Sequence, residues 1–175
     1  RSIFNLLGPL TNPAGVKRFV IGVFSNELCR PIAEVMKQLG AEHVTVVYSK
    51  DGLDEISLAS STYVAELKNG EITEWMITPE DVDIESKTLT GLIVDGSAES
   101  LALIKDALGK KKSAIGEKAA NMLALNAGAG IYVSGLTNDY KQGVALAHDI
   151  IYGGQALEKM DVLSEFTKTL KQYEA

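Results

Sequence analysis

The chain has 175 residues, of which 46% are hydrophobic and 23% charged, and this balance excludes a disordered, collagen-like or coiled-coil protein. The formal net charge of -6 argues against nucleic acid as a partner, and no run of about 20 apolar residues indicates a membrane span. A single cysteine, Cys29, excludes an intrachain disulfide, and without a signal-peptide pattern we expect a cytoplasmic enzyme or binding domain.

One domain over residues 1–175 is the expected organisation, because a chain of this length can bury a sufficient core without disulfides or metals. The sequence begins at Arg1 rather than at methionine, and it enters an apolar segment within two residues. We therefore expect this domain to be a piece of a longer protein.

The first third of the chain predicts a strand, a helix and a second strand. Phe19–Phe24 is an unbroken apolar run, typical of a strand covered on both faces in a parallel sheet. Residues 25–26 offer helix caps to a segment of helical spacing that starts at Glu27 and ends at Gly40. His43–Tyr48 is rich in valine and predicts the second strand. The unit has about the length of a parallel crossover.

The carboxyl ends of parallel strands are where ligands gather in such sheets. Two segments leave those ends, residues 25–27 and residues 49–57. We expect the chemistry of the protein to lie in these two segments.

The middle of the chain predicts an antiparallel hairpin. Thr62–Leu67 and Glu71–Ile77 flank Asn69–Gly70, a dipeptide that suits the positive φ angles of a tight turn. The acidic residues 79–85 then predict a solvated connection.

From Ser97 onward the apolar spacing is helical. Four helices are expected, at residues 97–108, at residues 116–133, from a cap at Asn138 or Asp139 to Ile151, and over Leu157–Leu170. The predicted fold class is therefore α/β: a mixed sheet with a parallel pair and a β-hairpin, covered by helices, with a helical C-terminal half.

Asp51–Glu55 is the acidic cluster that follows the second predicted strand. Carboxylates on such a loop, with Gly52 allowing a tight path, suit Mg²⁺ held through oxygen atoms, water and substrate phosphates. The same acids also suit a solvated turn before a helix, and spacing alone favours that interpretation.

Arg1 stands beside an apolar segment and is a candidate to pair with a substrate carboxylate, although the sequence alone favours a solvated terminal arginine. His43, His148 and Cys29 have no ligand-like neighbours in the sequence, so structural roles are expected for them. The chain contains no P-loop and no dinucleotide-binding glycine motif on a strand.

Three segments together closely resemble the anthranilate phosphoribosyltransferases. They are Arg1–Pro13 with the sequence RSIFNLLGPLTNP, Gly52–Ser57 with the sequence GLDEIS, and Asn126–Gly135 with its Ile-Tyr-Val core. Their order and separations match the family as well, and the resemblance corresponds to its C-terminal α/β domain.

The resemblance implies transfer of a phosphoribosyl group from 5-phosphoribosyl 1-pyrophosphate (PRPP) to anthranilate, in tryptophan biosynthesis, without a covalent enzyme intermediate. On this basis Asp54 and Glu55 help to hold Mg²⁺, Arg1 meets the anthranilate carboxylate, and no residue acts as a nucleophile. The family's N-terminal helical domain and its glycine-rich phosphate-binding turn would lie upstream of Arg1. The resemblance also implies that the complete enzyme is a homodimer. Because those upstream parts are needed for substrate binding, we expect this chain alone to be inactive.

Two other interpretations compete with the transferase. A pyrimidine nucleoside phosphorylase has a similar architecture and also acts at a ribosyl centre, but the adjacent acids at Asp54 and Glu55 favour the transferase. A noncatalytic relative would keep the fold and bind nucleic acid or a protein, and the acidic charge balance argues against nucleic acid.

Overall fold

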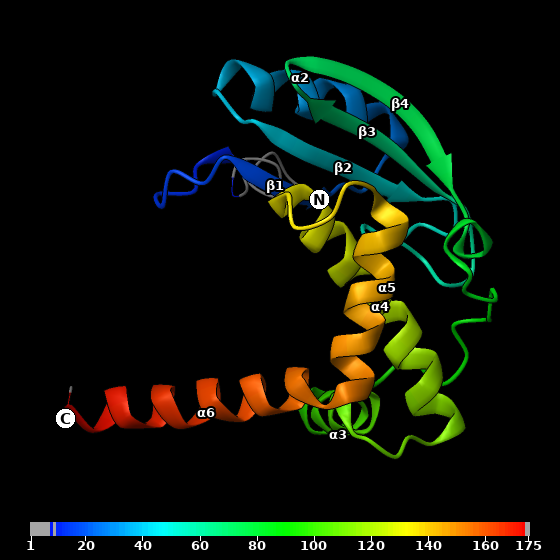
Figure 1. The fold of residues 1–175 in the computed structure, drawn as a ribbon, viewed down its shortest axis with the longest axis vertical. Helices are drawn as coiled ribbons and strands as arrows, with labels where there is room; N and C mark the ends of the chain where they lie inside the picture. Colours follow the sequence, from blue (N-terminus) through cyan, green and yellow to red (C-terminus); the bar gives the residue numbers. More distant parts are fainter. Residues whose placement is uncertain (1–7, 9, 174–175) are drawn as a thin grey trace.

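The computed structural model describes residue 8 and residues 10–173 and is a mixed sheet followed by a helical half (Figure 1). Its elements are β1 (Arg18–Gly22), η1 (Asn26–Leu28), α2 (Cys29–Gln38), β2 (His43–Ser49), β3 (Thr62–Lys68), β4 (Glu71–Ile77), η2 (Pro79–Val82), α3 (Ser97–Leu108), α4 (Ala114–Ser134), α5 (Tyr140–Gly153) and α6 (Gln155–Tyr173).

The four described strands are arranged in the order β1-β2-β3-β4. β1 and β2 are parallel, with Arg18 opposite His43, whereas β3 is antiparallel to both β2 and β4. The turn between β3 and β4 has φ angles of 53° at Asn69 and 78° at Gly70, as a tight hairpin turn requires. The predicted fold class, with its parallel pair and its hairpin, is confirmed.

β2 lies between two apolar cores, which explains why its sequence is apolar without alternation. Val44 and Val46 belong to the core beneath α2, together with Ile32 and Met36 of that helix. Val47 belongs to the core beneath α4, because successive strand residues face opposite sides of the sheet. β2 is therefore covered on both faces, as is typical of an inner strand of a sheet with a parallel pair. The same expectation for the strand at residues 19–24 is wrong, because β1 is an edge strand of the described sheet, in which Ile21 is buried while Val20 is 36% exposed.

The predicted helix caps at residues 25–26 are wrong, because Ser25 forms no side-chain capping hydrogen bond and α2 begins only at Cys29, after η1. Two of the later helices, α4 and α5, do have side-chain caps. The Ser113 hydroxyl accepts a hydrogen bond from the Gly116 backbone at 3.0 Å, and Asp139 accepts one from the Gln142 backbone at 2.8 Å. Of the two caps that the sequence allowed for α5, the structure uses Asp139.

The acidic residues of the connection after the hairpin are exposed, as predicted, while Val82 and Ile84 between them are buried in the core. The connection contains the short helix η2, which Thr78 and Asp81 cap reciprocally through their side chains and backbone. Glu80 and Asp83 face solvent there, so these acids belong to a solvated connection.

α6 begins at the end of α5 that lies far from the sheet and projects to one side of the molecule (Figure 1). Its predicted apolar positions are only partly covered, since Leu163 is 60% exposed and Phe166 is 59% exposed. In the part of the chain that the structure describes, no helix is long and apolar enough to cross a membrane.

α4 and α5 pack closely because glycines remove the side chains between them. A Cβ atom at Gly128 would lie 2.6 Å from the Val144 Cα atom, and one at Gly143 would lie 2.4 Å from the Gly128 carbonyl oxygen. Two residues further along α4, a Cβ atom at Gly130 would meet nothing within 4 Å. Close packing therefore explains Gly128 but not Gly130.

This difference predicts opposite effects of the same substitution on stability. Gly128→Ala is expected to lower the free energy of unfolding by about 1 to 3 kcal/mol, because the backbone of α5 has to move. Gly130→Ala is expected to leave it unchanged or raise it by up to about 1 kcal/mol through better helix propensity. Urea denaturation of both variants measures this, and equal effects would contradict the packing argument.

Candidate functional site at the carboxyl ends of the parallel strands

The acidic loop, defined here as residues 50–57, lies where both parallel strands end. It follows β2 directly, and its Asp54 backbone rests on the last residue of β1. A Cβ atom at Gly22 would lie 1.6 Å from the Asp54 carbonyl oxygen, so only glycine permits this approach. Residues 25–27, which follow β1, leave the same edge of the sheet. The structure thus brings the sequence-predicted site segments to one edge.

Hydrogen bonds within the acidic loop fix its path. The Ser49 backbone N–H donates to the Leu53 carbonyl at 3.0 Å, and the Gly52 N–H donates to the Ser49 carbonyl at 2.9 Å. The Ser57 hydroxyl donates to an Asp51 carboxylate oxygen at 2.5 Å. Burial alone would raise the pKa of Asp51, but the hydrogen bonds from Ser57 and from the Leu53 backbone contribute to lowering it. Asp51 is therefore a structural carboxylate of this loop.

Asp54 and Glu55 remain available at the surface of the loop. Both residues are exposed, and no described residue forms an ion pair with either of them. The Glu55 side chain also lines a hollow of about 290 Å³ beside Leu103 and Met122. Partial burial of its carboxyl group raises the pKa of Glu55, and the charges of Asp54 and Asp51 add to that effect. A cation placed here would offset the electrostatic repulsion between the Glu55 carboxylate and the charges of Asp54 and Asp51.

The donor set suits a hard cation that keeps part of its water shell. Among the described residues, no three His, Cys, Asp or Glu side chains gather into a group that could enclose a metal. Two neighbouring carboxylates without a third protein ligand match the way Mg²⁺ is usually held, with water and substrate phosphates completing the shell. Asp54 and Glu55 therefore fit the predicted ion, and their role as its ligands stays a prediction.

Arg1, the predicted anthranilate-binding residue, lies outside the described residues, as does most of the first motif. The other two motifs do come together. Asn126, the first residue of the third motif, forms hydrogen bonds with the backbone of Ile56 in the acidic loop, 70 residues earlier in the chain.

The histidines and the cysteine have structural surroundings, as the sequence predicted. Cys29 is buried in the core beneath α2, and this burial raises the pKa of its thiol to about 12, so it is not a reactive thiolate. His148 stacks on Tyr152 with their ring centroids 4.1 Å apart. His43 is buried beside Glu66.

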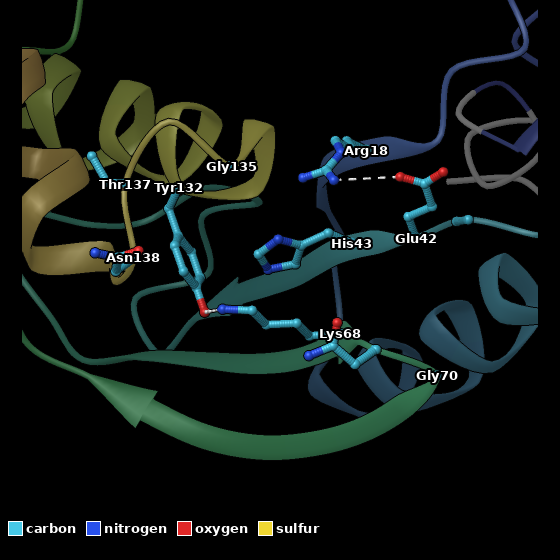
Figure 2. Close-up of a pocket in the computed structure, with 11 residues that line it drawn as sticks. Arg18, Glu42, His43, Lys68, Gly70, Tyr132, Gly135, Thr137 and Asn138 are labelled. Carbon is cyan, nitrogen blue, oxygen red and sulfur yellow. Dashed lines mark hydrogen bonds and ion pairs between the residues drawn. The ribbon is translucent and has the colours of Figure 1, made fainter.

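A second hollow, of about 630 Å³, lies at the amino ends of β1 and β2, on the opposite edge of the sheet from the acidic loop. Figure 2 shows its polar lining, with Arg18 paired to Glu42 and with Lys68 reaching the Tyr132 hydroxyl. The Arg18 guanidinium also donates to the Val133 carbonyl at 2.9 Å, which ties β1 to the end of α4.

A buried polar network adjoins this second hollow through His43 and Tyr132, which line it, and sequence reasoning did not find the network. Glu66 accepts hydrogen bonds from the Tyr132 hydroxyl at 2.6 Å and from the Trp75 indole at 3.1 Å, and His43 Nε2 lies 2.8 Å from it. Burial, followed by the hydrogen bond and charge of Glu66, raises the pKa of Tyr132. A glutamate on the inner face of a predicted strand was the available signal, but its partners are distant in sequence.

Comparison with known proteins places this chain in a family. Residues 1–157 match the model described as "Glycosyl transferase family, a/b domain". A protein of Acinetobacter baylyi called anthranilate phosphoribosyltransferase is 84% identical over 173 residues, which cover 99% of this chain and 50% of that protein. The chain therefore spans about half the length of the curated relatives that it matches.

Solved structures show the same fold. Anthranilate phosphoribosyltransferase from Thermus thermophilus superposes with a TM-score of 0.83 at 38% identity, covering 96% of this chain and 48% of that one. The enzyme of Saccharomyces cerevisiae in complex with PRPP and Mg superposes with a TM-score of 0.78 at 24% identity, covering 92% of this chain and 46% of that one. The resemblance found in the three motifs is confirmed, and this chain belongs to the glycosyl transferase family as its α/β domain.

Proposed function

We propose that this chain is the C-terminal part of an anthranilate phosphoribosyltransferase, which transfers the phosphoribosyl group of PRPP to anthranilate and releases pyrophosphate. The observation that carries this proposal is the 84% identity with the Acinetobacter baylyi protein of that name, over 99% of the chain. The adjacent carboxylates at the carboxyl ends of the parallel strands support it, because a pyrophosphate leaving group needs a divalent cation.

In the proposed reaction the anthranilate amine attacks the anomeric carbon of PRPP, and the bond to pyrophosphate breaks. Asp54 and Glu55 would hold Mg²⁺, which when bound offsets the negative charge of the departing pyrophosphate. Their solvent exposure leaves room for the donor's phosphate oxygens beside them. No side chain of this chain has to form a bond to the substrate, so the rate would come from orientation and electrostatics.

The remainder of the complete protein would supply what this chain lacks. Because the chain spans about half of its curated relatives, we infer that the phosphate-binding glycine turn and the helical domain over anthranilate lie in the other half. A homodimeric complete enzyme and a cytoplasmic location stay predictions. The high identity with a named transferase favours this function over a nucleoside phosphorylase.

The proposed function predicts activity for the complete protein and none for this chain alone. With saturating PRPP, Mg²⁺ and anthranilate, product fluorescence should report turnover by the complete protein, while the isolated chain should melt cooperatively and remain inactive. A complete protein that ignores anthranilate but cleaves a pyrimidine nucleoside with phosphate would contradict the proposal. Turnover by the isolated chain within about tenfold of the complete protein would contradict the need for the other half.

Replacing the acidic pair tests its proposed role. In the complete protein, Asp54→Asn with Glu55→Gln keeps side-chain size but removes both charges, so Mg²⁺-dependent binding of PRPP should weaken by at least about tenfold and turnover should fall. The matched control is Glu158→Gln with Asp161→Asn, which removes two exposed acids from α6. Calorimetric titration and steady-state kinetics measure both effects, and an unchanged Mg²⁺ requirement would remove the pair from the site.

Arg1 is proposed to bind the anthranilate carboxylate, on the basis of the first motif alone. A forked contact between a guanidinium and a carboxylate contributes about 1.5 to 3 kcal/mol, so Arg1→Ala in the complete protein should raise the KM for anthranilate roughly tenfold to a hundredfold. The KM for PRPP should change little. Arg30→Ala, on the exposed side of α2, is the control, and a normal anthranilate KM in Arg1→Ala would reject this role.

A further inference from the structure

The third sequence motif, Asn126–Gly135, has no role in the proposed chemistry so far, yet its first residue reaches the acidic loop. Asn126 Oδ1 accepts a hydrogen bond from the Ile56 backbone N–H at 2.9 Å, and Asn126 Nδ2 donates to the Ile56 carbonyl at 2.8 Å. One carboxamide therefore satisfies both backbone polar groups of a single residue. Two bonds from one planar group fix orientation as well as position.

The residue held in this way directly follows the acidic pair. The N–H of Ile56 belongs to the peptide bond that joins it to Glu55, so the contact with Asn126 sets the plane of that peptide. The Ile56 side chain is buried, with 4% of its surface exposed, and this adds an apolar anchor at the same point. On the other side of the pair, Gly22 allows the Asp54 carbonyl to rest against the end of β1. The two acids thus lie between two backbone contacts.

α4 is a firm support for this contact. Asn126 Nδ2 also donates to the Met122 carbonyl of its own helix at 3.1 Å, which orients the carboxamide. The Tyr140 hydroxyl donates to the Leu125 carbonyl at 2.9 Å, and Gly128 packs against α5 two residues after Asn126. The position of Asn126 is therefore fixed by the tight packing of α4 against α5.

We propose that Asn126 is a positioning residue for the acidic pair, holding the Glu55–Ile56 peptide so that Asp54 and Glu55 present their carboxylates to one divalent cation. This inference rests on the proposed role of the pair in holding Mg²⁺. Asn126 does not touch substrate or metal in this account. It acts only through the backbone of Ile56.

The test replaces Asn126 in the complete protein and measures the Mg²⁺ requirement. Asn126→Ala removes both bonds to Ile56 and should raise the Mg²⁺ concentration for half-maximal PRPP binding by about tenfold, while the KM for anthranilate stays near its original value. Asn126→Ser retains one short polar group and should give a smaller increase. Asn121→Ala is the matched control, because Asn121 lies on the same helix and lines a different hollow, near His148.

A purely structural role gives a different pattern. In that case Asn126→Ala would lower the melting temperature without moving the Mg²⁺ requirement, and this result would overturn the proposal. If neither variant folds, Asn126 is a structural residue and the proposal also fails.

Combining these variants with the replaced acidic pair separates the two proposals. Adding Asn126→Ala to Asp54→Asn with Glu55→Gln should cause no further rise in the Mg²⁺ requirement, because the ligands are already gone. If replacing the acidic pair matters but Asn126→Ala does not, the positioning role is wrong and the proposed function stands. If replacing the pair has no effect on the Mg²⁺ requirement, the metal role of the pair fails first.

Discussion

The backbone contact between Gly22 and Asp54 is the constraint on which the candidate site depends. It brings the acidic loop against the end of β1, although β1 and the loop are separated along the chain by α2 and β2. Because the glycine has no side chain, the loop can lie on the strand end itself. The parallel pairing of β1 with β2 then ensures that both strands deliver their carboxyl ends to this one place. The acidic pair is consequently built into the sheet edge and is not a free surface turn.

Local patterns in the sequence predicted the elements of the fold well. The Asn69–Gly70 turn, the strand at residues 19–24 and a cap at Asn138 or Asp139 each depend on a few adjacent residues. The structure shows the turn, a strand at Arg18–Gly22 and a cap at Asp139. The approximate place of the acidic loop was also predictable, because it follows from the rule on parallel strand ends.

Contacts between distant residues were not predictable in the same way. The buried Glu66 meets Tyr132, which lies 66 residues further along the chain, and Asn126 meets Ile56 across 70 residues. Neither pairing follows from spacing, since each depends on how α4 lies on the sheet. The glycines of α4 show the same limit, because only the packed structure distinguishes Gly128, which faces α5, from Gly130, which faces open space.

The account places the divalent cation at one of the two edges of the sheet, and the position of the ion can be tested directly. The carboxyl edge carries Asp54 and Glu55, while the hollow at the amino edge is lined by Arg18 and Lys68. The most direct measurement is a crystal structure of the complete protein with PRPP and Mn²⁺, in which anomalous scattering locates the ion. The account predicts an ion directly coordinated by the Asp54 or Glu55 carboxylate, and ions found only at other sites would contradict it.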